Sequence, residues 1–140
     1  MARADLPLAH GDGAGALIEA VTCGLQNTSG LCELRFDGGT LLLPQTRSVP
    51  LPERTPVRVR IQARDVSLSL VEPEKTSVLN ILPATVTDLS DDGPGQVLVG
   101  LRLGQGTRLL SRISQLSCQR LGVAPGRAVY AQVKGVAMVR

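Results

Sequence analysis

Apolar and polar residues alternate along much of this chain, which is the pattern of β-strands that bury one face in a hydrophobic core. The alternation is clearest at residues 57–62 (VRVRIQ) and 66–70 (VSLSL) in the first half of the chain. In the second half it recurs at residues 84–87, 96–103 and 129–133. Glycine, proline and aspartate separate these short runs. The pattern predicts a mainly β protein made of small barrels or sandwiches.

One segment has the spacing of a helix instead of a strand. Residues 114–121 (SQLSCQRL) place their apolar side chains at helical intervals. Ser114 is a suitable N-cap, and Gly122 follows the last turn, where glycine commonly ends a helix. We therefore expect one short helix between two strands of the second half.

The chain also contains an internal repeat. Residues 34–43 (LRFDGGTLLL) resemble residues 101–110 (LRLGQGTRLL), and the strand at 56–61 resembles the one at 127–133. Each copy has a strand, a glycine turn, a strand, a linker and a further strand. We expect a flexible leader at residues 1–14, a first unit at 15–71 and a second unit at 72–140. Units this small are only marginally stable alone, so they should pack together or exchange strands.

Composition narrows the classes of function. Hydrophobic residues make up 43% of the 140 residues, enough to bury a core, whereas Phe36 and Tyr130 are the whole aromatic content. Binders of single-stranded nucleic acid use stacked aromatic side chains, and a net charge of +3 gives little attraction for phosphates. A nucleic-acid reader in which Arg58, Arg60 and Arg64 follow the phosphates stays as an alternative. Three cysteines without a C-x-x-C pair favour a reduced, cytoplasmic setting.

The sequence offers no catalytic constellation. The only histidine, His10, lies in the glycine-rich leader with no cysteine nearby, which argues against a zinc site and against a Ser–His–Asp triad. The glycine-rich residues 11–15 lack the following Gly-Lys-Ser/Thr of a phosphate loop. We expect no catalytic residues, no metal site, and no enzyme activity from this chain by itself.

Residues that suit a small anion stand at the two ends of the second unit. Ser77 offers a hydroxyl, Asn80 an amide, Lys134 a positive charge, and Gly135 closely approachable backbone N–H groups. The first and last strands of a small barrel are commonly neighbours, which would bring these residues together. The alternative is that Ser77 and Asn80 cap a turn and Lys134 is a solvated strand end.

Two longer motifs resemble a known family. Residues 76–83 (TSVLNILP) are similar to the T-S-x-R-N-x-L opening of the Mop module, and residues 121–134 (LGVAPGRAVYAQVK) resemble its L-G-L-x-x-G-x-x-V-x-A-x-I-K ending. Residues 59–68 are similar to the segment that precedes Mop in the ATPase subunit of molybdate importers. The resemblance covers nearly the whole chain. It implies two tandem small OB-like β-barrels, the second being of the Mop type and containing the short helix.

The resemblance also implies a function and a site. It makes the chain a regulatory module of an ABC-type molybdate importer ATPase, which senses cytoplasmic molybdate or tungstate and restrains uptake. Ser77, Asn80 and Lys134 would bind the oxyanion with the backbone of Gly135, and no other cofactor is required. The family's arginine is Leu79 here, which removes one cation.

The implied partners are a second copy of the chain, the ATPase domain of the parent protein and, through it, a membrane permease, with no nucleic acid. The parent would lie at the inner face of the cell membrane and hydrolyse ATP, whereas this chain has no Walker motifs. A structural module that dimerises the same ATPase without binding a ligand is the alternative.

Overall fold

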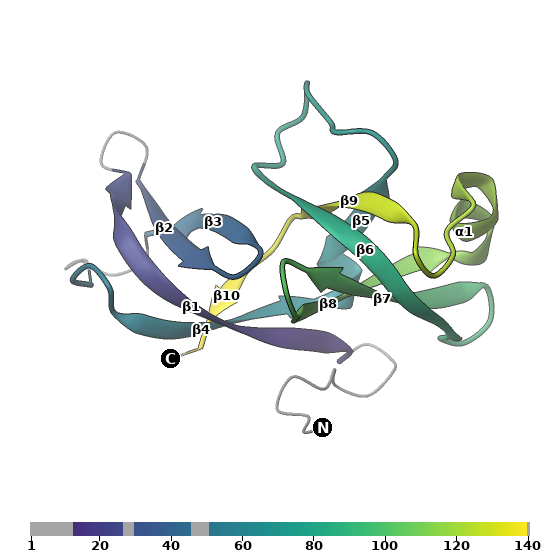
Figure 1. Ribbon diagram of the computed structural model, residues 1–140, viewed down its shortest axis with the longest axis horizontal. Coiled ribbons are helices and arrows are strands. Elements are labelled where there is room, and N and C mark those ends of the chain that lie inside the picture. Colours follow the sequence, from purple (N-terminus) through teal and green to yellow (C-terminus); the bar gives the residue numbers. More distant parts are fainter. Residues whose placement is uncertain (1–12, 27–29, 46–50, 140) are drawn as a thin grey trace.

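The computed structural model describes residues 13–26, 30–45 and 51–139. Two curled five-stranded sheets lie side by side, and a short helix stands at the far end of the second (Figure 1). The first sheet has the order β10-β4-β1-β2-β3 and the second the order β5-β9-β6-β7-β8, with every neighbouring pair antiparallel. The prediction of a mainly β fold with two barrel-like units and a helix in the second is confirmed.

The strands of the first sheet are β1 (Gly15–Gln26), β2 (Leu31–Phe36), β3 (Gly39–Pro44), β4 (Pro56–Gln62) and β10 (Ala137–Met138). Those of the second are β5 (Val66–Ser69), β6 (Asn80–Asp91), β7 (Gln96–Leu103), β8 (Thr107–Ser114) and β9 (Ala128–Val133). The 3-10 turn η1 (Ala63–Asp65) joins β4 to β5, and α1 (Gln115–Leu121) lies between β8 and β9.

The two halves of the chain exchange their last strands. Strand β5 is the last strand of the first half but pairs with β9 of the second, with Val66 opposite Val133. Strand β10, at the other end of the chain, pairs with β4 of the first sheet, with Ala137 opposite Arg60. Each sheet is thus completed by a strand from the other half, and the boundary expected at residues 71–72 stays a prediction.

The two halves also share one continuous core. Strand residues alternate between buried and exposed, as in β4, where Val57, Val59 and Ile61 face inward. Inward-facing residues of both sheets belong to the same cluster, and its fully buried members include Leu34, Leu41, Val99, Leu101 and Leu109. Ala14, the last residue of the expected leader, is buried as well, and residues 1–12 lie outside the described residues.

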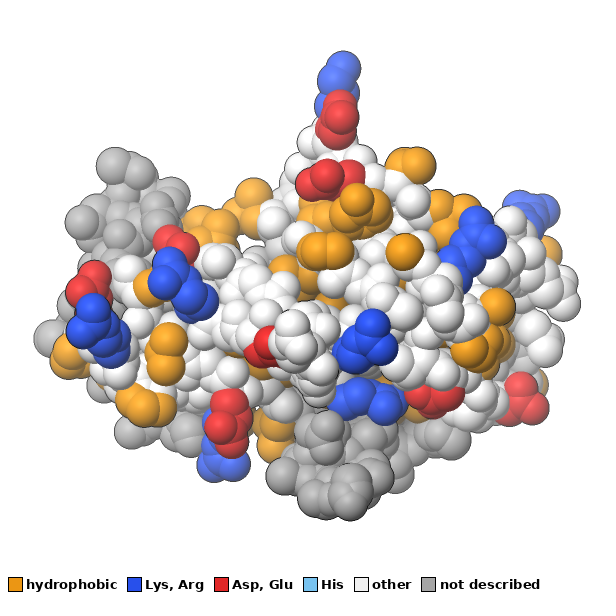
Figure 2. All heavy atoms as spheres, in the orientation of Figure 1, with side chains coloured by type: hydrophobic (Ala, Val, Ile, Leu, Met, Phe, Trp, Pro, Cys, Tyr) orange, Lys and Arg blue, Asp and Glu red, His pale blue; other side chains and the backbone are white. Residues whose placement is uncertain are grey.

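The face drawn in Figure 2 carries hydrophobic, basic and acidic side chains. Basic and acidic side chains are interspersed over the face in Figure 2 and do not gather into one patch. No helix in the described part of the chain is long and apolar enough to cross a membrane.

The predicted helix is confirmed together with both of its ends. Ser114 is the N-cap, and its Oγ accepts the N–H of Ser117 at 3.0 Å. Gly122 ends the helix in the left-handed conformation with φ of 65°, which glycine adopts without steric cost.

The hairpin turns of the two sheets are joined by Asp37. Its Oδ2 accepts the N–H groups of Gln105, Gly106 and Thr107 at 2.9 to 3.3 Å, and also the hydroxyl of Thr107 at 3.1 Å. The N–H of Gly106 is the largest cause of a lowered pKa at the Asp37 carboxyl. A carboxylate on the β2–β3 turn thereby holds the β7–β8 turn of the other sheet.

This contact predicts an acid-sensitive contribution to stability. The folded protein lowers the pKa of Asp37, so its contribution is present above the unfolded value of about 3.9 and is lost as the pH falls through the folded pKa. Asp37→Asn should therefore unfold at a lower temperature than the native protein at pH 7, and the difference should shrink below about pH 4. Thermal unfolding from pH 7 to pH 3 checks this, with the exposed Asp91→Asn as the matched control. A pH-independent difference would contradict it.

Candidate anion site

Strand pairing brings the two motifs of the second unit together. Strands β6 and β9 are neighbours, as the sequence predicts, and Asn80 at the start of β6 lies opposite Val133 at the end of β9. Lys134 and Gly135 follow Val133 directly, and Ser77 precedes Asn80 on the β5–β6 loop. The pairing thus sets Asn80 beside Val133 and does not by itself place Ser77 beside Lys134.

Asn80 is buried, with 8% of its surface exposed, and its side chain makes two hydrogen bonds. Its Oδ1 accepts the N–H of Leu42, and its Nδ2 donates to the carbonyl of Leu42, both at 2.8 Å. Leu42 belongs to β3, the edge strand of the first sheet. Asn80 thus bridges the two sheets.

Ser77 lies on the loop between β5 and β6, which stands out from the body of the protein (Figure 1). Its side chain is exposed. Beside it, the hydroxyl of Thr76 accepts the N–H of Val78 at 3.1 Å and forms a local turn. Leu79, which stands where the family has arginine, is 61% exposed, so the missing cation leaves an apolar side chain at the surface.

Lys134 and Gly135 pack against the 3-10 turn η1. Lys134 has an exposed side chain, and its backbone N–H donates to the carbonyl of Asp65 at 2.8 Å. At position 135, a Cβ would lie 2.9 Å from Asp65 Oδ2. Glycine therefore allows the Asp65 carboxylate to lie directly against this backbone.

A hollow of about 260 Å³ opens next to Gly135. Four side chains from the end of β4 and from η1 line it: those of Arg60, Gln62, Arg64 and Asp65. Residues 135–137 complete the lining. The sequence pattern assigns Gly135 to an anion site, whereas it offers Arg60 and Arg64 only as contacts in the nucleic-acid alternative. The sequence does carry a signal for the two arginines. Polar residues at 60, 62 and 64 alternate with buried residues at 59, 61 and 63.

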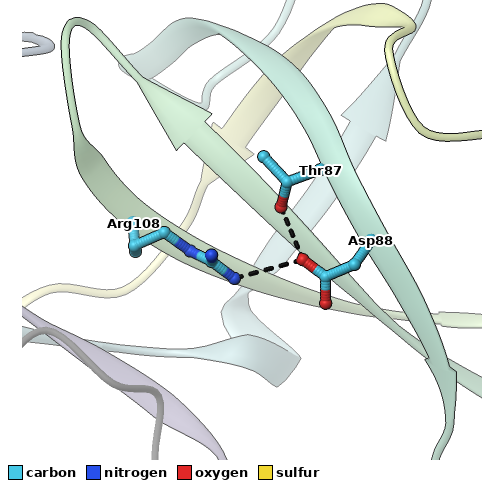
Figure 3. A network of polar contacts seen from close by, with 3 residues as sticks. All are labelled: Thr87, Asp88 and Arg108. Atoms are coloured by element: carbon cyan, nitrogen blue, oxygen red, sulfur yellow. Dashed lines mark hydrogen bonds and ion pairs between the residues drawn. The ribbon is translucent and has the colours of Figure 1, made fainter. Parts of the chain in front are cut away.

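Another polar network lies apart from these residues. Asp88 Oδ1 accepts the Thr87 hydroxyl at 2.6 Å and an Arg108 N–H at 3.2 Å (Figure 3). A Cβ at Gly100 would collide with this Asp88 oxygen, so glycine makes room for the ion pair. Because the pair is substantially exposed, it adds little stability. It touches neither Lys134 nor the hollow.

The cysteines do not form a site. Cys23, Cys32 and Cys118 are free thiols, and burial raises the pKa of both Cys23 and Cys32, which keeps them protonated. In residues 13–26, 30–45 and 51–139 there is no group of three His, Cys, Asp or Glu residues that could hold a metal ion. His10 lies outside the described residues.

A known family model matches the second half of the chain. Residues 76–139 match the model described as "TOBE domain".

Two curated relatives are similar over essentially the whole chain. It is 48% identical to "Molybdenum import ATP-binding protein ModC" from Albidiferax ferrireducens, over 99% of this chain and 37% of that protein. It is 45% identical to the protein of the same name from Aromatoleum aromaticum, over 100% of this chain and 36% of that protein. The chain therefore spans little more than a third of the length of these relatives.

A solved structure has the same fold. It is a crystal structure of the cytoplasmic molybdate-binding protein ModG with molybdate bound. The TM-score is 0.73, and the match covers 88% of this chain and 92% of that one at 22% sequence identity. This likeness establishes the arrangement of strands in both halves of the chain.

Proposed function

We propose that this chain is an oxyanion-binding module that takes molybdate or tungstate at the end of the β6–β9 ladder. The observation that carries the proposal is the register that sets Asn80 opposite Val133, the residue directly before Lys134 and Gly135. The printed names of the relatives and of the ModG structure support molybdate as the ligand.

Each residue has a distinct role in the proposed site. The exposed Lys134 supplies the positive charge, and Ser77 supplies a hydroxyl from the protruding loop. Gly135 contributes its backbone N–H from the side away from the Asp65 carboxylate. Asn80 offers the second N–H of its amide while its other two contacts fix the segment to Leu42. Charge-assisted hydrogen bonds of this kind are the strongest available to a small anion.

The wider role follows from the relatives. We propose that the module belongs to the ATP-binding subunit of a molybdate importer, at the cytoplasmic face of the membrane, and that its occupancy restrains uptake by the permease. ATP hydrolysis then resides in the part of the parent protein that this chain does not span, and the module pairs with a second copy of itself.

Calorimetric titration with molybdate tests the site. We expect Lys134→Ala to weaken binding about tenfold, because it removes one charge-assisted contact. Leu79→Arg should strengthen binding by a similar factor, since position 79 is exposed and adjoins the site. Arg120→Ala on the exposed face of α1 removes the same charge elsewhere and serves as the control. Unchanged affinity in Lys134→Ala would contradict the assignment.

A structural dimerisation module is the second candidate. Two large apolar residues of the β5–β6 loop favour it, because Val71 is 71% and Leu79 61% exposed. This candidate predicts a dimer whose mass does not depend on molybdate, together with no heat on titration. Light scattering of the purified chain with and without molybdate separates it from the oxyanion-binding function.

A further inference from the structure

The hollow beside Gly135 has the size and the position of a second anion site. It lies where β4 and η1 meet the segment that links β9 to β10, so both halves of the chain contribute to it. Its volume of about 260 Å³ equals that of several waters, each of which occupies about 30 Å³ in the liquid. A tetrahedral oxyanion and its bridging waters fit this space.

Arginine donors on one wall favour an anion. Arg60 is held in place by a hydrogen bond of 3.1 Å from its Nη2 to the carbonyl of Gly13. Its Nε is buried and has no hydrogen-bond partner within the protein. Arg64 adds a second guanidinium from η1, and its side chain is exposed. Because Arg60 Nε is closed to water, an oxyanion would be held instead by the guanidinium N–H groups that Arg60 and Arg64 present on the lining.

Acceptors on the same lining restrict which anion fits. The carboxylate of Asp65 lines the hollow, and Gln62 Oε1 is buried without a hydrogen-bond partner within the protein. A fully deprotonated oxyanion such as sulfate or molybdate presents only acceptors, so it would be repelled by Asp65. An oxyanion that retains a proton presents a donor as well and can pair with both kinds of group.

We propose that this hollow binds a small protonated oxyanion of the hydrogen phosphate class, separately from the molybdate site at Lys134. Arg60 and Arg64 donate to its oxygens, and Asp65 accepts its proton. Gly135 borders both sites, but the hollow draws its charged groups from the first half of the chain and the molybdate site draws its cation from the second. The hollow distinguishes anions by whether they keep a proton, because the Asp65 carboxylate can accept a hydrogen bond only from an oxygen that carries one.

Calorimetry of the whole chain with inorganic phosphate tests this, with sulfate at equal ionic strength as the comparison. We expect phosphate to bind at least about tenfold more tightly than sulfate. Arg64→Ala should weaken phosphate binding about tenfold while leaving molybdate binding unchanged. Asp65→Asn, which preserves the shape, should weaken phosphate and strengthen sulfate until the two are similar. Arg102→Ala, on the exposed face of β7, is the charge control, and unfolding temperatures without ligand verify that each variant is folded.

The outcomes separate this site from the proposed function. Loss of phosphate binding in Arg64→Ala with retention in Lys134→Ala supports two sites. Equal binding of phosphate and sulfate, or phosphate binding that Arg64→Ala and Asp65→Asn leave unchanged, overturns the inference while molybdate binding stands. Loss of both ligands in Lys134→Ala also overturns it, because one site would then serve both anions.

Discussion

Replacing Gly104 by alanine is expected to destabilise the protein by about 2–4 kcal/mol. Gly104 begins the β7–β8 turn with φ of 56°, where an L side chain is strained. A Cβ there would also lie 2.5 Å from the backbone oxygen of Asp37. Backbone cannot rotate away as a side chain does, so the two hairpin turns would have to separate.

The separation would carry a second cost. Asp37 Oδ2 holds three backbone N–H groups of the β7–β8 turn, and moving the turns apart breaks the contact that joins the two sheets there. Denaturant unfolding of Gly104→Ala measures the steric strain at position 104 and the loss of the Asp37 contact together. Gly106→Ala is the control in the same turn, because nothing lies within 4 Å of a Cβ at that position. It should change stability by less than about 0.5 kcal/mol. Equal effects of the two substitutions would refute the role of turn packing.

The strands and the helix were predictable because their signals are local. Alternation at residues 57–62 gives β4, whose buried side chains are every second residue. Ser114 and Gly122 bound the helix because capping depends on neighbours within a few residues. The glycines of the repeat likewise indicate the turns of both hairpins, which form β2–β3 and β7–β8.

The connection between the two halves was only partly predictable. The small size of the units predicts that they pack together or exchange strands. No local pattern predicts that β5 pairs with β9 or that β10 pairs with β4. Likewise, the contact of Asp37 with Thr107 spans 70 residues of sequence. Side chains of this kind look like ordinary polar turn residues until their distant partners are known.

The candidate site shows the same limit. Lys134 and Asn80 were found from their motifs, and the register places them at the same end of one ladder. The contact of Asn80 with Leu42 was not predictable, because Leu42 belongs to the other sheet and lies 38 residues away. The hollow was missed for a similar reason. Arg60 and Arg64 look like ordinary surface residues of their own segment. They line a hollow only because residues 135–137 pack beside them.

Asn80→Ala is the second substitution with a large expected effect, a loss of about 1–3 kcal/mol in the free energy of unfolding. Strand β3 is an edge strand, so the N–H and C=O of Leu42 that face away from β2 have Asn80 as their partner. Alanine would leave both groups unpaired in a partly buried place. The matched control is Gln132→Ala on β9, because that amide makes one exposed hydrogen bond of 3.2 Å to Ser67 Oγ. Its cost should stay below about 0.5 kcal/mol.

Denaturant unfolding measures both variants, and an unchanged midpoint for Asn80→Ala would contradict the bridging role. Molybdate titration at a temperature where the variant is fully folded then separates stability from binding. In the proposed site, Asn80 donates its second amide N–H to the anion while its other contacts go to Leu42, so affinity should fall even when the folded fraction does not. A variant that is less stable but binds molybdate like the native protein would restrict Asn80 to joining the two sheets and leave Ser77, Lys134 and Gly135 as the anion's partners.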